Sequence, residues 1–243
     1  MKRLLIKISV FVKGLIIMVR PHLYLNWLTK HFLFIYNTVQ LSKWIHNQEK
    51  KDILNDFYTS KRDYAKKYVL HEYIINKYKL DENPFDYLEF GVFEGNSFKW
   101  WLNRCKNINH KFYGFDTFEG LPEQWGTYEK GEMLAKLPDI NDDRSKLYKG
   151  LFQDTLPVFI ENKTIDKERR KIIHLDADLF SSTIFTLTTL AFYIKKGDIL
   201  IFDEFNVPNH EYFAFKIYTE SFYVKYKLIG SVNNYYQVAI MIE

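Results

Sequence analysis

The chain has 243 residues, of which 47% are hydrophobic, and this is enough for one α/β domain with a sizeable core and an additional segment. Its formal net charge of +4 is modest for this length, whereas nucleic-acid-binding proteins usually carry a concentrated basic patch, so we expect no nucleic-acid partner. The single cysteine, Cys105, excludes an internal disulfide and favours a reducing compartment, so we expect a cytoplasmic protein.

Residues 1–20 combine basic and apolar side chains in a pattern that predicts an amphipathic helix. On a helical projection with about 100° per residue, the apolar side chains fill one side and the basic ones fall on an arc of roughly 140°: Lys2, Arg3, Lys7, Lys13 and Arg20. The longest uncharged run, 14–19, is too short for a transmembrane helix, which needs about 20 apolar residues. Two interpretations stay open: peripheral contact with the inner face of a membrane, or packing on the catalytic domain or a second subunit.

Residues 22–80 predict further helices with aromatic stripes at helical spacing, typical of core or dimer contacts. Pro21 is expected to end the first helix, since proline disrupts a helix interior. We divide the chain into an N-terminal helical segment, residues 1–80, and a second domain, residues 81–243, and expect a homo-oligomer.

From residue 86 onward, strands and helices alternate, which predicts an α/β fold: a Rossmann-like, doubly wound, mostly parallel sheet. The last two strands flank Asn233-Asn234 and predict an antiparallel hairpin at the sheet edge. The expected strands are 87–90, 112–116, a weaker one at 147–152, 171–175, 199–203, 225–229 and 237–242.

Acidic residues lie at the ends of four of these strands: Glu89, Asp116, Asp176 and Asp203. Ligands of open α/β sheets bind at the carboxyl ends of the strands, so these side chains should meet in one crevice. The glycines at 91 and 95 permit a tight turn after the first strand. The full dinucleotide fingerprint is absent because Phe93 takes the middle glycine position, and no Gly-Lys-Ser/Thr follows. A nucleoside without a pyrophosphate therefore fits best, with Asp116 accepting hydrogen bonds from its ribose.

Asp176 and Asp203 are separated by about one β-α-β unit, so their strands can be neighbours. Together with Glu204 they can hold one hard divalent cation, and Mg²⁺ prefers such carboxylate oxygens. We interpret Asp178 and residues 181–183 mainly as helix caps.

At these residues the chain resembles the class I S-adenosylmethionine-dependent methyltransferases, and among them the macrocin O-methyltransferase type, which methylates sugar hydroxyls. The stretches that carry the resemblance are 88–97, 114–122, 149–157, 174–183 and 198–205.

The resemblance implies residue roles as well as cofactors. Asp176, Asp203 and Glu204 would bind Mg²⁺, and Asp176 would also be the catalytic base. The methyl donor, S-adenosylmethionine, would be held by Glu89, Gly91, Phe93, Gly95, Ser97, Asp116, Thr117, Phe118, Gln153, Asp154 and Asp176.

The chain departs from the family pattern at Asp203-Glu204, where the family usually has two aspartates. We expect an O-methyltransferase acting on a small-molecule or glycan acceptor, with the segment 124–144 as a lid or a surface loop. Two rivals stay open: an inactive methyltransferase fold that serves as a scaffold in polysaccharide assembly, and a nucleotide-dependent oxidoreductase.

Overall fold

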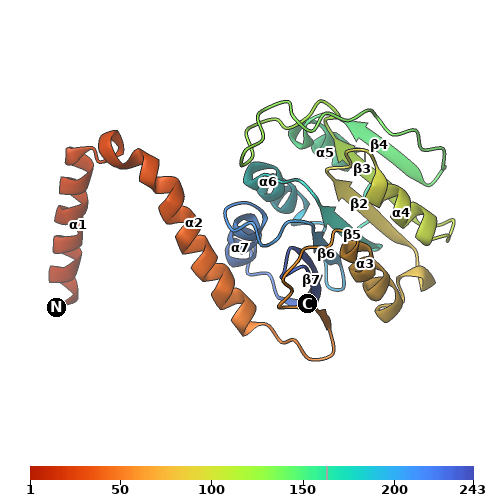
Figure 1. The fold of residues 1–243 in the computed structure, drawn as a ribbon, viewed down its shortest axis with the longest axis horizontal. Coiled ribbons are helices and arrows are strands. Elements are labelled where there is room, and N and C mark those ends of the chain that lie inside the picture. The colour runs from red at the N-terminus through yellow and green to blue at the C-terminus, as the bar shows by residue number, and fades with distance from the viewer. Residues whose placement is uncertain (163) are drawn as a thin grey trace.

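The computed structural model describes residues 1–162 and 164–243. Within this part of the chain the strands form one eight-stranded sheet, in the order β1-β7-β8-β6-β5-β2-β3-β4 (Figure 1). The strands are β1 Leu54–Asn55, β2 Phe85–Phe90, β3 Lys111–Asp116, β4 Ser145–Lys149, β5 Arg170–Leu175, β6 Ile199–Phe202, β7 Tyr226–Val232 and β8 Gln237–Ile242.

The sheet is parallel except at one strand. β2 pairs in parallel with β3 and β5, and β6 continues the same direction beside β5. Only β8 runs against its neighbours, β6 and β7. The mostly parallel sheet with a C-terminal antiparallel pair confirms the predicted fold class. β2, β5 and β6 are buried along almost their whole length, and their apolar residues are interrupted in β2 by Asp86 and Glu89 and in β5 by Lys171 and His174.

The predicted position of the hairpin at the sheet edge is wrong. The short strand β1 adds in parallel outside β7 and was not predicted. Its segment is held by the turn between β7 and β8: the side chain of Asn234 accepts from the backbone N–H of Thr59, and that of Asn233 accepts from the N–H of Asp63. Two residues of strand give too short a pattern to recognise in a sequence.

Helices cover both faces of the sheet. On one face α5 (Phe152–Glu161), α6 (Phe180–Leu190) and α7 (Glu211–Ser221) bury residues such as Phe159, Leu187 and Phe215 against the strands. On the other face α3 (Lys66–Lys77) and α4 (Asn96–Arg104) bury Ile74 and Trp101. A 3₁₀ turn, Leu80–Glu82, leads into β2. Although α3 lies in the predicted N-terminal segment, it forms part of the layer that covers the sheet.

The first two helices, α1 (Lys2–Val19) and α2 (His22–Asn47), extend away from this body (Figure 1). The predicted break near Pro21 is confirmed, since α1 ends with Arg20 in the left-handed conformation and Pro21 caps the start of α2. Among the described residues, no helix is long and apolar enough to cross a membrane.

Candidate active site

A cavity of about 210 Å³ lies at the carboxyl ends of β2, β3 and β5, where ligands of open α/β sheets bind. Its walls come from the loops after these strands, from the start of α5 and from the segment 120–133. The lining residues are Gly91, Phe93, Asp116, Thr117, Gly120, Leu121, Pro122, Met133, Leu151, Phe152, Gln153, Asp176, Ala177, Asp178, Ser182 and Glu204.

The turn after β2 packs directly against the chain that follows β5. Gly91 has φ +94°, and a Cβ placed on it would lie 1.7 Å from the carbonyl oxygen of Asp176. The backbone N–H of Gly91 donates to Phe115 at 2.9 Å, and the N–H of Asp176 donates to Phe90 at 2.9 Å. A residue with a side chain therefore cannot occupy position 91 without separating these loops.

The carboxylate of Asp116 is fixed by the backbone on both sides. The N–H of Phe93 donates to its Oδ2 at 2.8 Å, and the N–H of Phe118 donates to its Oδ1 at 2.7 Å. Each carboxylate oxygen can accept a second hydrogen bond. Asp116 thus presents oriented acceptors to the cavity, as recognition of two ribose hydroxyls requires.

Glu89 lies below the cavity and does not line it. Its side chain is fully buried and accepts hydrogen bonds from Ser97 Oγ at 2.7 Å and from the Tyr87 hydroxyl. The ring of His174 lies beside it, with Nδ1 3.6 Å from Oε2. In this arrangement Glu89 and Ser97 support the turn that carries Gly91.

The structure brings about half of the predicted cofactor-binding residues into the cavity wall. These are Gly91, Phe93, Asp116, Thr117, Gln153 and Asp176. The others lie beside or beneath it: Glu89, Gly95, Ser97, Phe118 and Asp154. Gly95 begins α4 and contacts the segment 124–144, because a Cβ placed on it would lie 3.0 Å from Pro138.

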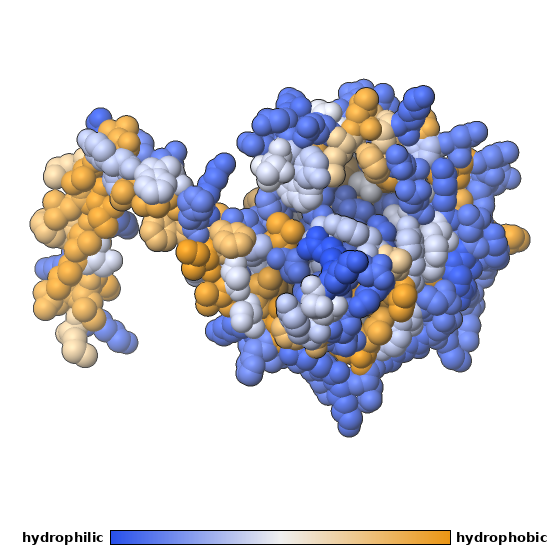
Figure 2. Space-filling model, viewed as in Figure 1, coloured by the Kyte–Doolittle hydropathy of each residue, from blue (hydrophilic) through white to orange (hydrophobic). Residues whose placement is uncertain are grey.

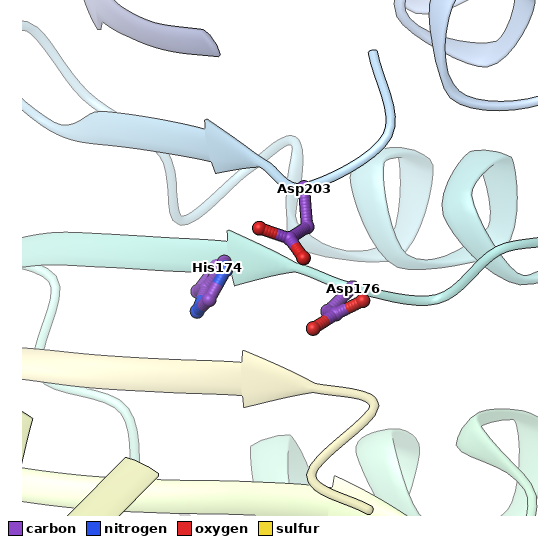
Figure 3. A group of neighbouring side chains, drawn as sticks. All are labelled: His174, Asp176 and Asp203. Atoms are coloured by element: carbon purple, nitrogen blue, oxygen red, sulfur yellow. The ribbon is translucent and has the colours of Figure 1, made fainter. Parts of the chain in front are cut away.

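Three potential metal ligands from β5 and the end of β6 face one another: His174, Asp176 and Asp203 (Figure 3). One ligand atom from each lies within 4.8 Å of the others. Glu204, which we predicted as the third ligand, lines the cavity with Asp176 but is not part of this group. Its Oε1 accepts a hydrogen bond from the Tyr236 hydroxyl.

The donor atoms of this cluster suit a hard divalent cation. Asp203 Oδ1 and Glu204 Oε2 are buried and have no hydrogen-bond partner among the described residues. Burial, reinforced by the carboxylate of Asp203, raises the pKa of Asp176 well above its ordinary value, and burial also raises the pKa of Glu204. Burial and mutual repulsion therefore disfavour the ionised form of these carboxyls, and a bound cation would offset this.

Lys67 of α3 also reaches this cluster, and the sequence reasoning missed it. Its ammonium group donates to Asp203 Oδ2 at 3.4 Å. Burial opposes the charge on Lys67, but the carboxylates of Asp203 and Asp176 outweigh burial, so the pKa of Lys67 is raised. Lys67 therefore partly balances the charge of these carboxylates.

The interpretation of Asp178 as a helix cap is wrong. α6 begins after Leu179 without a side-chain cap, and Asp178 adopts φ +56° and lines the cavity. Burial, and then the neighbouring carboxyl of Glu204, raise the pKa of Asp178 to about 8. A carboxyl that can exchange a proton near neutral pH thus faces the same space as Asp176.

The segment 124–144 forms part of the cavity's surroundings. Met133 lines the cavity, and Pro138 packs near Gly95. At its end, the guanidinium of Arg144 donates to the carbonyl oxygen of Leu102 and to Asp142. The segment is therefore tied to the body while its middle covers the site.

Replacing Gly91 tests the close contact between the two loops. We expect Gly91→Ala to lower the free energy of unfolding by about 3 kcal/mol or more, because a Cβ would collide with the backbone of Asp176. Gly126→Ala is the matched control: Gly126 has φ +56° with open space around its Cβ position, so it should lose only about 1 kcal/mol. Equal losses in urea denaturation would contradict the contact.

Replacing Lys67 tests the charge balance. Without divalent cations, Lys67→Met should lower the free energy of unfolding by about 2–3 kcal/mol, because it leaves buried carboxylates uncompensated. Millimolar Mg²⁺ should then raise its melting temperature more than that of the wild type. Lys66→Met is the control, since Lys66 pairs with Asp56 away from the cluster. The same Mg²⁺ response in all three proteins would refute the assignment.

Comparison with known proteins agrees with this geometry. A family described as a methyltransferase domain matches residues 88–205. The structure of CalS11, a calicheamicin methyltransferase, superposes with a TM-score of 0.58 at 19% identity, covering 85% of this chain and 91% of that one. The O-methyltransferase NovP gives a TM-score of 0.54 at 21% identity, covering 69% of this chain and 76% of that one.

A second CalS11 structure, an apo form described as a TDP-rhamnose 3'-O-methyltransferase, gives a TM-score of 0.51 at 20% identity, with 85% and 93% of the two chains covered. A search of curated protein sequences gives no match. At these identities the solved structures show a shared fold, and the family match falls on the strands and loops that build the cavity. Residues 88–205 match the methyltransferase-domain family, and the chain shares its fold with the solved methyltransferases CalS11 and NovP.

Proposed function

We propose that this protein is an O-methyltransferase that uses S-adenosylmethionine and a divalent cation, Mg²⁺ in the first instance, to methylate a hydroxyl of a sugar or glycan. The observation that carries the proposal is the meeting of two half-sites in one cavity. The Gly91 turn and the oriented Asp116 form one half, and the carboxylates of Asp176, Asp178 and Glu204 form the other.

Each half suits one reactant. Asp116 would accept hydrogen bonds from the ribose of the methyl donor, and the backbone at Gly91 allows it a close approach. Asp176 and Asp203, with His174 beside them, would hold the cation, and Glu204 would add a carboxylate from the cavity wall. When bound, the cation would supply positive charge that lowers the pKa of a nearby hydroxyl, and S-adenosylmethionine would supply the methyl group.

The chain's own residues would then position the acceptor and take its proton. We propose Asp176 as the acceptor of the hydroxyl proton, with Asp178 as the next carboxyl able to receive it, since both line the cavity. The remainder of the barrier reduction would come from holding the reactants in a fixed orientation. This route needs no covalent intermediate on the protein.

The choice of a sugar acceptor rests on chemistry rather than on a bound ligand. Neighbouring sugar hydroxyls are hard oxygen donors that suit a carboxylate-held cation. CalS11 is described as a methyltransferase of TDP-rhamnose, and it shares this fold. A role in polysaccharide or natural-product synthesis follows as a proposal, as does a homo-oligomeric state.

The two rivals explain less of the structure. An inactive scaffold would have no use for buried carboxylate oxygens that lack partners, which cost stability. A nucleotide-dependent oxidoreductase would need a pyrophosphate-binding loop, and Phe93 stands where its middle glycine would be. A nucleic-acid substrate is disfavoured too: residues 49–243 carry 27 Lys and Arg against 30 Asp and Glu, a net charge of −3.

The proposal can be tested by separating donor binding from turnover. Asp116→Asn should weaken binding of S-adenosylhomocysteine at least tenfold, measured by calorimetry. This is about the affinity that one hydrogen bond to a charged group contributes. Asp203→Asn should keep that binding but lower methylation of an accepted sugar at least 100-fold, measured by mass spectrometry with Mg²⁺ present. Asp143→Asn, which alters an exposed carboxylate outside the cavity, is the control for both.

The proposal would be contradicted if Asp116→Asn kept its affinity for S-adenosylhomocysteine and Asp203→Asn kept its methylation activity. If the wild type binds S-adenosylhomocysteine but methylates no nucleotide sugar or oligosaccharide, the proposed donor site stands. The proposed class of acceptor, a sugar or glycan, is then wrong. A protein that does not bind S-adenosylhomocysteine, with or without Mg²⁺, would favour the scaffold.

A further inference from the structure

The N-terminal arm, which we define as residues 1–36 (α1 and the first part of α2), exposes apolar side chains along its whole length. α1 buries none of its residues. Figure 2 shows hydrophobic side chains covering this arm, apart from the more hydrophilic body. The exposed apolar and aromatic residues include Leu4, Leu5, Ile6, Ile8, Val10, Phe11, Val12, Leu15, Ile16, Ile17, Met18, Val19, Leu23, Tyr24, Leu25, Trp27, Phe32, Leu33, Phe34, Ile35 and Tyr36.

The charge of the same region is entirely positive. Residues 1–48 contain seven Lys and Arg and no Asp or Glu, while the rest of the chain has a net charge of −3. The first acidic residue is Glu49. The seven basic residues are Lys2, Arg3, Lys7, Lys13, Arg20, Lys30 and Lys43. Apolar surface and positive charge are thus concentrated together, whereas the body has the opposite sign.

The end of α2 ties the arm to the catalytic body. The Asn37 amide donates to Asn209 Oδ1 at 2.9 Å, and Leu41 is buried in the core. The indole N–H of Trp44 donates to the Tyr226 hydroxyl at 2.9 Å, and its ring packs 4.8 Å from that of Phe205, centroid to centroid. Phe205 directly follows the acids Asp203 and Glu204. The arm is therefore joined to the segment that carries the candidate metal ligands.

We propose that the N-terminal arm binds the surface of an anionic lipid bilayer, with its apolar side chains in the interfacial region and its Lys and Arg at the lipid headgroups. Basic residues near such a surface each strengthen binding about fivefold, and buried apolar side chains add to this. Tyr24, Trp27 and Tyr36 are exposed on the arm, and such amphipathic rings favour the membrane–water interface.

Charge complementarity favours a bilayer over the arm of a second copy of the chain. Two arms brought together would place six positive charges against six others with no acidic partner. The apolar surface of α1 is also wide: on the helical projection it covers more than half of the circumference, and Ile6, Val10 and Ile17 lie within the basic arc. A helix sunk part-way into lipid can bury so wide a surface, whereas a helix packed on a protein usually buries a narrower stripe.

The helices would lie on the membrane rather than cross it, because no described helix is long and apolar enough to span a bilayer. The anionic leaflet available to a protein in a reducing compartment is the cytoplasmic one. The inference goes beyond the proposed function, since it does not depend on the methyl donor or acceptor.

Vesicle flotation of the full-length protein tests the proposal. The wild type should bind phosphatidylcholine vesicles that contain phosphatidylglycerol at least tenfold more strongly than pure phosphatidylcholine vesicles, and less strongly at high salt. A variant with Lys2, Arg3, Lys7 and Lys13 changed to Gln should lose at least tenfold of this binding. The control changes Lys50, Lys106, Lys196 and Lys225 to Gln, which removes the same charge from exposed positions outside the arm and should bind like the wild type.

The apolar part is tested by Phe11→Glu with Leu15→Glu, compared with Phe192→Glu, which alters an exposed aromatic on the body. The arm variant should lose vesicle binding and keep the circular dichroism and melting temperature of the wild type, since neither side chain is buried.

Two outcomes would overturn the proposal. One is equal loss of vesicle binding in the arm and control charge variants. The other is a wild type that does not bind vesicles and is a dimer by light scattering, while the variant with Phe11→Glu and Leu15→Glu is a monomer. The arm would then be a subunit interface.

Discussion

The backbone of Gly91 lies so close to the carbonyl oxygen of Asp176 that no side chain fits between them. This contact joins the turn after β2 to the loop after β5, and β2 and β5 are neighbours in the sheet. The first loop leads to Phe93, whose N–H orients Asp116, and the second carries Asp176 and Asp178. The close contact between the backbones of Gly91 and Asp176 therefore positions both halves of the cavity. The pairing of β2 with β5 in the sheet holds these two loops side by side.

Charge is the second constraint on the site. Carboxylates from the ends of β5 and β6 are buried together, and Lys67 of α3 pairs with Asp203. Burying like charges is unfavourable unless protons or cations compensate, so this arrangement is costly as a purely structural device. The same arrangement is useful in an enzyme that binds a cation and accepts a proton from a hydroxyl. The helix that carries Lys67 also packs on the sheet, so α3 contributes both to the hydrophobic core and to the charge balance of the site.

The central strands could be predicted because their signals are local. Each contains apolar residues that are buried on both faces of the sheet, and each is followed at once by an acid or a glycine. Asp116 and the pair Asp176 and Asp203 followed from strand order, since the carboxyl ends of parallel strands share one edge. The placement of these residues therefore required no knowledge of side-chain contacts.

Other features depend on contacts between distant segments. Glu89 looks like a ligand at a strand end, yet Tyr87, Ser97 and His174, from two strands and a helix, enclose it. Lys67 has no motif around it, and it reaches Asp203 only because α3 packs over the sheet. Asp178 precedes a helix, as a cap would, but its left-handed backbone turns the side chain into the cavity. Strand β1 forms only because the turn at Asn233 and Asn234 holds its segment.

The central claim is that a methyl-donor site and a cation-holding carboxylate cluster meet at Asp176, which lines the cavity. A crystal structure of the protein with S-adenosylhomocysteine and Mn²⁺ tests it most directly, because anomalous scattering locates the metal independently of the ligand. The account predicts the ribose hydroxyls within hydrogen-bonding distance of Asp116 and an anomalous peak between Asp176 and Asp203. A ligand bound elsewhere, or a structure with the donor in place and no metal at those carboxylates, would contradict it.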